Sequence, residues 1–265
     1  MDRPGGVALG SGEPMNAPVS LTLFAHVAAR PEEELDLAEA ALLIGDAEYP
    51  GLDISRYLAT LDRMGEEARR VLAGPRSGAE IAPGSGSIEQ LLVWLYGHHG
   101  FRGNTTDYYD PRNSYLNEVL DRRVGIPITL AVVLLEVCRR AGLEAQGVSF
   151  PGHFLVRTPA EGGLLLVDPF EGRLLGREDL RALHARATGA ARDPDARLLA
   201  PTTKRQILVR MLSNLRAIYG RRPDPDRLRG VLERMQVLAP SEDLRRELEQ
   251  LGGERPWPSR GHTLH

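Results

Sequence analysis

A histidine and an aspartate at the two ends of a predicted β-hairpin are the side chains in this chain best suited to proton transfer. The hairpin is predicted because two β-type segments flank the turn sequence PAEG at 159–162. A symmetric loop pairs Thr158 with Gly163, and His153 then lies directly opposite Asp168. Directly opposed residues have Cβ atoms about 4.5–5.5 Å apart, so the carboxylate can orient the imidazole as in a catalytic triad. The alternative is a pair that only satisfies its own hydrogen bonds at the strand ends.

A polar and aromatic stretch before this hairpin is the second candidate for chemistry. Residues 100–117 (GFRGNTTDYYDPRNSYLN) show no clear periodicity, and several of their side chains can bond neighbouring backbone. One interpretation is a loop that caps itself. The other is a loop that lines a cleft, since long ordered loops often carry sites. The cleft candidates are Asn104, Asp107, Tyr108, Tyr109, Asn113 and Tyr115, with Asn117 and Arg123 as further groups for electrostatic stabilisation.

The single cysteine offers neither a disulfide nor a reactive thiol. Cys138 has no second cysteine to pair with. It falls well inside a predicted buried helix, where a thiol lacks the electropositive, partly exposed setting that reactivity requires. No Cys/His spacing typical of a metal site occurs, and the adjacent His98 and His99 would point about 100° apart on a helix. We therefore expect no metal and no cofactor.

One apolar helix is expected to organise these groups. Residues 127–140 are apolar nearly all round, which is typical of a helix buried in the core. Pro127 suits the first helical position, and Gly142 suits the left-handed position just past the end. Periodicity predicts further helices over about 21–31, 32–46, 54–73, 88–98, 114–122, 177–184, 204–220, 224–238 and 241–251, and strands over 144–150, 153–158 and 163–168.

The expected domain organisation follows from composition shifts along the chain. The predicted parts are a disordered N-terminus at 1–18, a main domain at 19–184, a linker at 185–203, a helical segment at 204–251 and a disordered tail at 252–265. The helical segment has the spacing of one tetratricopeptide unit. Because one unit cannot form a solenoid, we expect it to pack on the main domain or on a protein partner.

Composition argues against several classes of partner. The net charge is −3, with 33 basic and 36 acidic residues interleaved along the chain. Such a balance gives no general attraction to nucleic acid or to acidic membrane surfaces. No apolar run approaches the roughly 20 residues of a membrane span, and the N-terminus lacks the pattern of a signal peptide. We expect a cytoplasmic protein.

Three strings in this chain resemble the SirB-type proteins of bacteria: FRGNTTDYYDPRNSYLNEVLDRRVGIPITL, FPGHFLVR and VDPFEGRLL. The resemblance covers roughly residues 30–240. It implies an α+β fold with a papain- or transglutaminase-like core, in which a buried central helix packs on a small antiparallel sheet. It also implies a helical N-terminal part and a C-terminal tetratricopeptide segment. Members of this family are usually described as transcriptional regulators.

The resemblance also implies where a nucleophile would lie. In the wider superfamily a cysteine begins the central helix, where the helix dipole lowers its pKa, and a histidine and an aspartate follow on neighbouring strands. Matching that pattern to this chain places Pro127 at the cysteine, His153 at the histidine and Asp168 at the aspartate. Loss of a triad nucleophile costs on the order of a millionfold in turnover. Thr129 lies about 200° further around the helix, and Cys138 lies about 16 Å along its axis, so neither replaces it.

Three hypotheses follow. The first is a non-catalytic descendant of the fold that keeps the cleft to bind a peptide or small ligand and uses its C-terminal helices for a protein partner. The second is a hydrolase or transferase in which His153, oriented by Asp168, is a general base without a protein nucleophile. The third is a scaffold whose former site is only structural.

Overall fold

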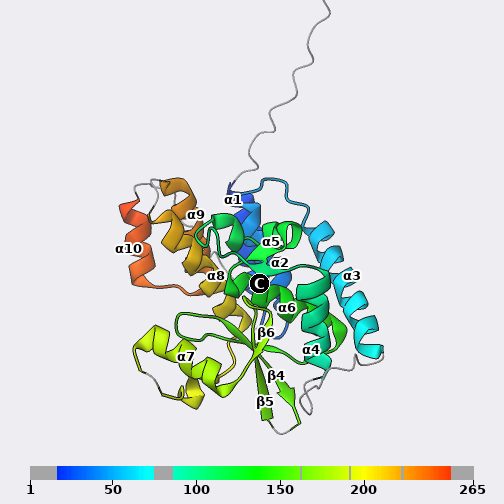
Figure 1. Cartoon of the computed structure of the whole chain (residues 1–265). Helices are drawn as coiled ribbons and strands as arrows, with labels where there is room; N and C mark the ends of the chain where they lie inside the picture. The colour runs from blue at the N-terminus through cyan, green and yellow to red at the C-terminus, as the bar shows by residue number, and fades with distance from the viewer. Residues whose placement is uncertain (1–16, 75–85, 162, 191, 222–223, 252–265) are drawn as a thin grey trace, which may run out of the picture.

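The computed structural model describes residues 17–74, 86–161, 163–190, 192–221 and 224–251. Figure 1 shows helices arranged around one central helix, with a small sheet on one side of it. This is the α+β arrangement expected for a transglutaminase-like core. The expected disordered ends at 1–18 and 252–265 lie almost entirely outside the described residues.

The central helix is α6 (Pro127–Ala141), and it is buried as its composition predicts. Leu130, Val132 and Leu134 are each at most 1 % exposed. Proline at the first position removes only an N–H that would have no partner within the helix. Gly142 ends the helix with φ +83°, a conformation that glycine adopts without steric cost.

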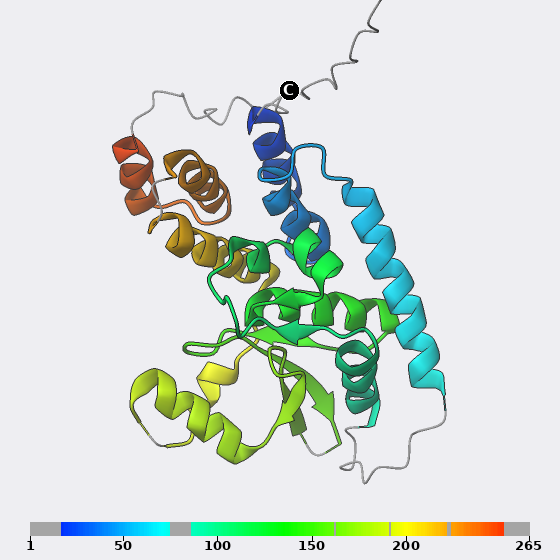
Figure 2. The ribbon, with the colours of Figure 1, turned by 45° about the horizontal axis from the view of Figure 1, so that its top comes forward.

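The N-terminal half of the chain is helical and surrounds α6. Its elements are α1 (Ala17–Ala28), α2 (Leu37–Asp46), α3 (Ile54–Ala73), α4 (Gly86–Leu92), the π-helix η1 (Val93–His98), the 3-10 helix η2 (Pro111–Ser114) and α5 (Leu116–Arg122). Helix α2 begins later than the predicted 32–46, because the Asp36 side chain accepts a hydrogen bond from the Glu39 N–H and so caps the helix there. The long helix α3 packs along α6 (Figure 2).

Two short strands join the polar loop to the start of α6. Strand β1 (Arg102–Gly103) pairs in parallel with β2 (Val124–Gly125). The Asn104 N–H donates to the Gly125 carbonyl at 2.9 Å. The loop that follows β1 is thereby held beside the first turn of α6.

The main sheet is antiparallel, with strands in the order β3-β4-β5-β6. These are β3 (Gln146–Val148), β4 (Leu155–Ala160), β5 (Gly163–Asp168) and β6 (Arg173–Leu175). The predicted hairpin exists, but its predicted register is wrong. Ala160, not Thr158, pairs with Gly163, because the Pro159–Ala160 pair continues the strand instead of turning. The pairing therefore shifts by two residues, which keeps each side chain on its expected face because strand side chains alternate with a period of two.

The C-terminal part of the chain packs on the same core. Helix α7 (Arg177–Thr188) and the 3-10 helix η3 (Ala196–Leu199) follow the sheet, and α8 (Lys204–Tyr219), α9 (Pro225–Leu238) and α10 (Glu242–Gln250) come last. Ile207 and Leu212 on α8 and Leu232 on α9 belong to the hydrophobic cluster that contains α6. In both ribbon views α8–α10 lie on the side of the molecule opposite to α3 (Figures 1 and 2). No helix of the described segments is long and apolar enough to cross a membrane.

Candidate functional site

The carboxylate of Asp168 is fixed by the turn that follows β5. Its Oδ1 accepts the N–H of Phe170 at 2.8 Å and the N–H of Glu171 at 3.2 Å, and the residue is 4 % exposed. Burial alone would raise the pKa of Asp168. Its interactions with His153 and with the two backbone N–H groups outweigh the effect of burial, so the pKa of Asp168 lies below its usual value. Asp168 is therefore an ionised, rigidly oriented group at neutral pH.

His153 reaches this carboxylate from the turn that precedes β4. Gly152 adopts φ +68°, and the His153 N–H donates to the Phe150 carbonyl at 3.0 Å. The ring Nε2 then lies 2.9 Å from Asp168 Oδ1. The ring does not direct an N–H straight at the oxygen, so the contact is a close polar contact rather than a linear hydrogen bond.

The shifted hairpin register explains why this contact survives. Strand β4 begins at Leu155, and the register that pairs Val156 with Val167 carries Leu155 opposite Asp168. His153 is two residues before Leu155, which places it on the same face and one diagonal step away. A long side chain spans that step. The predicted His–Asp pair is therefore present in the structure, but the two residues are diagonal neighbours at the open end of the hairpin instead of direct partners.

A cavity of about 500 Å³ opens beside the pair. His153 and Asp168 line it together with Pro127, Tyr108 and Phe170. The His153 side chain is 15 % exposed, so solvent reaches it. The first residue of α6 and the His–Asp pair thus share one cavity, as the superfamily layout implies.

The residue that the family resemblance places at the nucleophile position, Pro127, has no nucleophilic side chain. Pro127 is the first residue of α6, and no side chain caps this end of the helix. Thr129 is fully buried, which agrees with its predicted direction away from Pro127. Cys138 is also fully buried, and burial raises the pKa of its thiol to about 12. Neither side chain is placed to form a covalent intermediate in the cavity.

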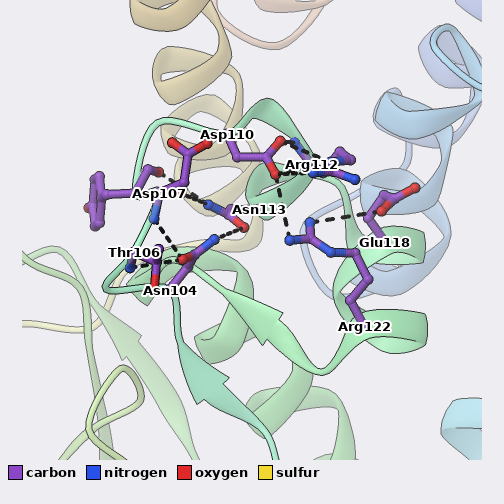
Figure 3. A network of polar contacts seen from close by, with 9 residues as sticks. Asn104, Thr106, Asp107, Asp110, Arg112, Asn113, Glu118 and Arg122 are labelled. Atoms are coloured by element: carbon purple, nitrogen blue, oxygen red, sulfur yellow. Dashed lines mark hydrogen bonds and ion pairs between the residues drawn. The ribbon is translucent and has the colours of Figure 1, made fainter.

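Two asparagines of the polar loop are used by the loop itself (Figure 3). Asn104 Oδ1 accepts the N–H groups of Thr106 at 3.2 Å and Asp107 at 2.9 Å. The Asn104 amide donates to Asn113 Oδ1 at 3.0 Å, and the Asn113 amide donates to the Asp107 carbonyl at 2.8 Å. These bonds cap the loop and leave Asn104, Asp107 and Asn113 outside the set of residues that line the cavity.

The remaining predicted cleft residues separate into one that lines the cavity and four that do not. Tyr108 lines it, whereas Tyr109 is 60 % exposed beside it. The Tyr115 hydroxyl is buried 2.8 Å from the hydroxyl of Tyr219, and it ties η2 to α8. Of the other two, Asn117 is 3 % exposed, and Arg123 ends α5 with φ +59° and donates to the His99 carbonyl at 2.7 Å.

Sequence reasoning missed two features of this region. The first is the ion-pair cluster around buried Asp110, which contacts Arg112 at 2.8 Å and Arg122 at 3.5 Å (Figure 3). The second is the wall that α7 gives to the cavity through Leu183 and Arg186. The order of elements could have indicated this wall, because α7 follows β6 directly and β6 pairs with the strand that ends at Asp168.

Comparison with known proteins places this geometry in a family. Residues 55–213 match the transglutaminase-like superfamily, a range that contains Pro127, His153 and Asp168. A UPF0162 protein of Xylella fastidiosa (strain Temecula1) is 41% identical over 227 residues, which cover 84% of this chain and 78% of that protein. A UPF0162 protein of Pseudomonas aeruginosa is 33% identical over 194 residues, covering 73% and 68%. F-box only protein 21 of Mus musculus is 33% identical over 174 residues, which cover 62% of this chain and 26% of that protein.

Proposed function

This chain belongs to the transglutaminase-like superfamily, and we propose that it is a non-catalytic member that binds a peptide or small ligand in the cavity beside His153 and Asp168. One observation carries the proposal. The His–Asp pair is built into the cavity wall at 2.9 Å, while the position from which a thiol would attack holds Pro127. The cavity therefore offers shape, an oriented imidazole and a carboxylate, without a cysteine thiol among the residues that line it.

The physical roles of these residues in binding differ. His153 presents a ring at the cavity surface that both donates and accepts hydrogen bonds, depending on its tautomer. Asp168 fixes the ring and supplies negative charge behind it. Phe170 and Tyr108 add aromatic surface to the same cavity, which favours an apolar portion of a ligand.

The proposal also assigns a role to the C-terminal helices. Helices α8–α10 serve as a tetratricopeptide-like surface for a protein partner, and ligand binding in the cavity has a regulatory purpose, as in the SirB-type description, within the cytoplasm. The packing of α9 against both α8 and α10 supports this assignment.

A panel of short synthetic peptides, screened by thermal shift and remeasured by calorimetry, tests the binding proposal. We expect His153→Ala to retain the fold and to weaken the binding of every hit by about tenfold or more, the size expected for a lost hydrogen bond to a charged group. Arg70→Ala is the matched control, because Arg70 is exposed on α3, far from the cavity. Hits that bind His153→Ala as tightly as the wild-type protein would refute the proposal.

A second candidate function follows from the exposure of His153. An imidazole that is 15 % exposed and held against a carboxylate is positioned to act as general base on water or on a substrate hydroxyl. This hydrolase or transferase needs no protein nucleophile. It predicts product release from a bound peptide or ester that stops in His153→Ala, whereas the binding protein returns its ligand unchanged in a mass spectrum after prolonged incubation.

A further inference from the structure

An aromatic surface extends from the cavity to the outside of the molecule. Tyr108 lines the cavity, and its ring lies 6.2 Å from the ring of Phe170, centroid to centroid. Tyr109 packs edge-on against Tyr108 at 5.4 Å. The two tyrosines, which we call the tyrosine shelf, are 42 % and 60 % exposed. Large exposed aromatic side chains next to a cavity are typical of a surface that binds a partner.

Three arginines surround the tyrosine shelf. The Arg221 guanidinium lies 5.6 Å from the centre of the Tyr109 ring. Arg210 on α8 is close enough to Tyr108 to oppose the rise in the pKa of that hydroxyl caused by burial. Arg186 on α7 lines the cavity from the other side. All three side chains are exposed.

Ion pairing separates the arginines of this region, although other exposed arginines such as Arg63 and Arg70 are also unpaired among the described residues. At the same cavity Arg173 is paired with Asp179 at 2.8 Å. In contrast, Arg186, Arg210 and Arg221 make no ion pair with any residue that the structure describes. What distinguishes Arg186, Arg210 and Arg221 is their place beside the cavity or the tyrosine shelf, in a chain whose net charge is −3 and whose surface is therefore not generally basic.

The acidic groups nearby limit what such a surface can accept. In the cavity Asp168 is held by His153 and Asp179 by Arg173, which leaves Glu171 as the free carboxylate. Asp107, next to Tyr108 in the sequence, is also exposed. Three carboxylates therefore line the cavity against the guanidinium groups of Arg173 and Arg186, so the cavity suits a neutral side chain, and the unpaired positive charge lies at Arg186 and beside the tyrosine shelf.

We infer that the tyrosine shelf and the three arginines bind an extended acidic segment of a partner protein, with one apolar side chain of that segment in the cavity. The inference rests on the proposed binding function and names its ligand class. Carboxylates of the segment face Arg186, Arg210 and Arg221, while its backbone and apolar side chains lie on the tyrosines. Arginine and tyrosine are the residue types that most often dominate the energy of such interfaces.

A single-stranded nucleic acid fits this surface less well. Aromatic rings and arginines also suit stacked bases and phosphates. A nucleic acid, however, carries a negative charge at every nucleotide, whereas Glu171 lines the cavity and Asp107 is exposed next to Tyr108 in the sequence. An acidic peptide places its charges at intervals and enters the cavity with a neutral side chain, so it avoids both carboxylates.

The experiment uses three fluorescein-labelled probes with the full-length protein. The first is a peptide of about ten residues with glutamates alternating with alanines around a central phenylalanine, long enough to span cavity and shelf at roughly 3.3 Å per residue. The second replaces every glutamate by lysine, and the third is an oligothymidine of similar length. Binding is measured by fluorescence polarisation at low and at physiological salt.

The informative variant is Arg210→Ala/Arg221→Ala, and its control is Arg63→Ala/Arg70→Ala. The control changes the net charge equally on α3, on the opposite side of the molecule (Figure 2). We expect the acidic peptide to bind the wild-type protein and the control alike, and to bind the shelf variant about tenfold more weakly, from two exposed charge pairs at the strong end of their range. Binding should also weaken at higher salt.

The outcomes separate this inference from the function on which it rests. If the two peptides bind equally and His153→Ala weakens both, the cavity binds peptides but the acidic specificity is wrong. If the oligothymidine binds more tightly than the acidic peptide through the same arginines, the partner class is wrong. If binding of the acidic peptide depends on the arginines but not on His153, the cavity takes no part in binding, and the claim that an apolar side chain of the peptide enters the cavity is wrong. If neither peptide binds, the inference fails and so does the peptide form of the proposed function.

Discussion

Replacing Asp168 separates the two tasks that its carboxylate performs. One is to accept the N–H groups of Phe170 and Glu171, which fixes the turn after β5. The other is to hold the ring of His153 at 2.9 Å. Asp168→Asn keeps an oxygen for the turn but loses the negative charge, whereas Asp168→Ala removes both interactions.

The expected magnitudes follow from the number of partners lost. Asp168→Asn weakens a charge-assisted contact of a buried residue, and we expect a loss of about 1–2 kcal/mol in the free energy of unfolding. Asp168→Ala also leaves two N–H groups without an acceptor, at a further cost of about 1–3 kcal/mol. For a chain of this size each kcal/mol corresponds to roughly 2–4 °C in Tm. The alanine variant should therefore melt several degrees below the asparagine variant.

The pH dependence has a definite sign. The pKa of Asp168 is lowered in the folded protein, so its contribution to stability is present above the unfolded-state pKa and is lost as pH falls through the folded-state pKa. The asparagine does not titrate. The stability difference between wild type and Asp168→Asn should narrow as the pH falls below about pH 4.

Urea unfolding followed by circular dichroism across this pH range measures both effects. Equal stability of wild type and Asp168→Asn at neutral pH would refute the claim that the contact with His153 stabilises the fold. Equal stability of the asparagine and alanine variants would show that the turn does not depend on the carboxylate oxygen. A difference that widens in acid would contradict the assigned direction of the pKa shift.

Two further predictions test the lineage and the turns. Pro127→Cys places a thiol at the uncapped start of α6, and we expect iodoacetamide to modify it faster than an ordinary exposed cysteine. Cys138 should stay unmodified, because burial raises the pKa of its thiol to about 12. Modification of the new cysteine at an ordinary rate would count against the placement of Pro127 at the nucleophile position. Gly172→Ala should cost about 1–3 kcal/mol more than Gly142→Ala in urea unfolding, because both have positive φ but only the Cβ at 172 meets the ring of Tyr96; equal losses would contradict the crowding.

Local patterns predicted most helices of this fold because periodicity and caps are short-range signals. Residues 54–73 form α3 as their spacing indicates, and the apolar run from Pro127 forms the buried α6. The start of α2 differed because Asp36 provides a cap inside a stretch of helix-forming acids. Hairpin register is harder to predict, because it depends on where the loop closes, and Pro159 and Ala160 were assigned to the turn although they extend β4.

The site was predictable only in part, because some of its residues are close in sequence and others are far apart. His153 and Asp168 belong to one hairpin, so local pairing brings them together whether the register is shifted by two residues or not. Tyr108 and the α7 residue Arg186 reach the same cavity from different parts of the chain, and only tertiary packing brings them there. The sequence predicts a cleft role for the loop asparagines because they are polar, but Asn104 and Asn113 form their hydrogen bonds within the loop itself.

Pro127 and Asp168 differ in what the fold requires of them. The first position of a helix tolerates proline without loss of a hydrogen bond, so Pro127 removes no internal hydrogen bond from α6. Asp168 is different, because it holds a turn as well as the imidazole. Substitutions at Pro127 are therefore expected to leave the fold intact, whereas substitutions at Asp168 are expected to destabilise it. The binding that we propose relies on groups that the fold itself holds in place, namely the imidazole that Asp168 orients and the aromatic walls of the cavity.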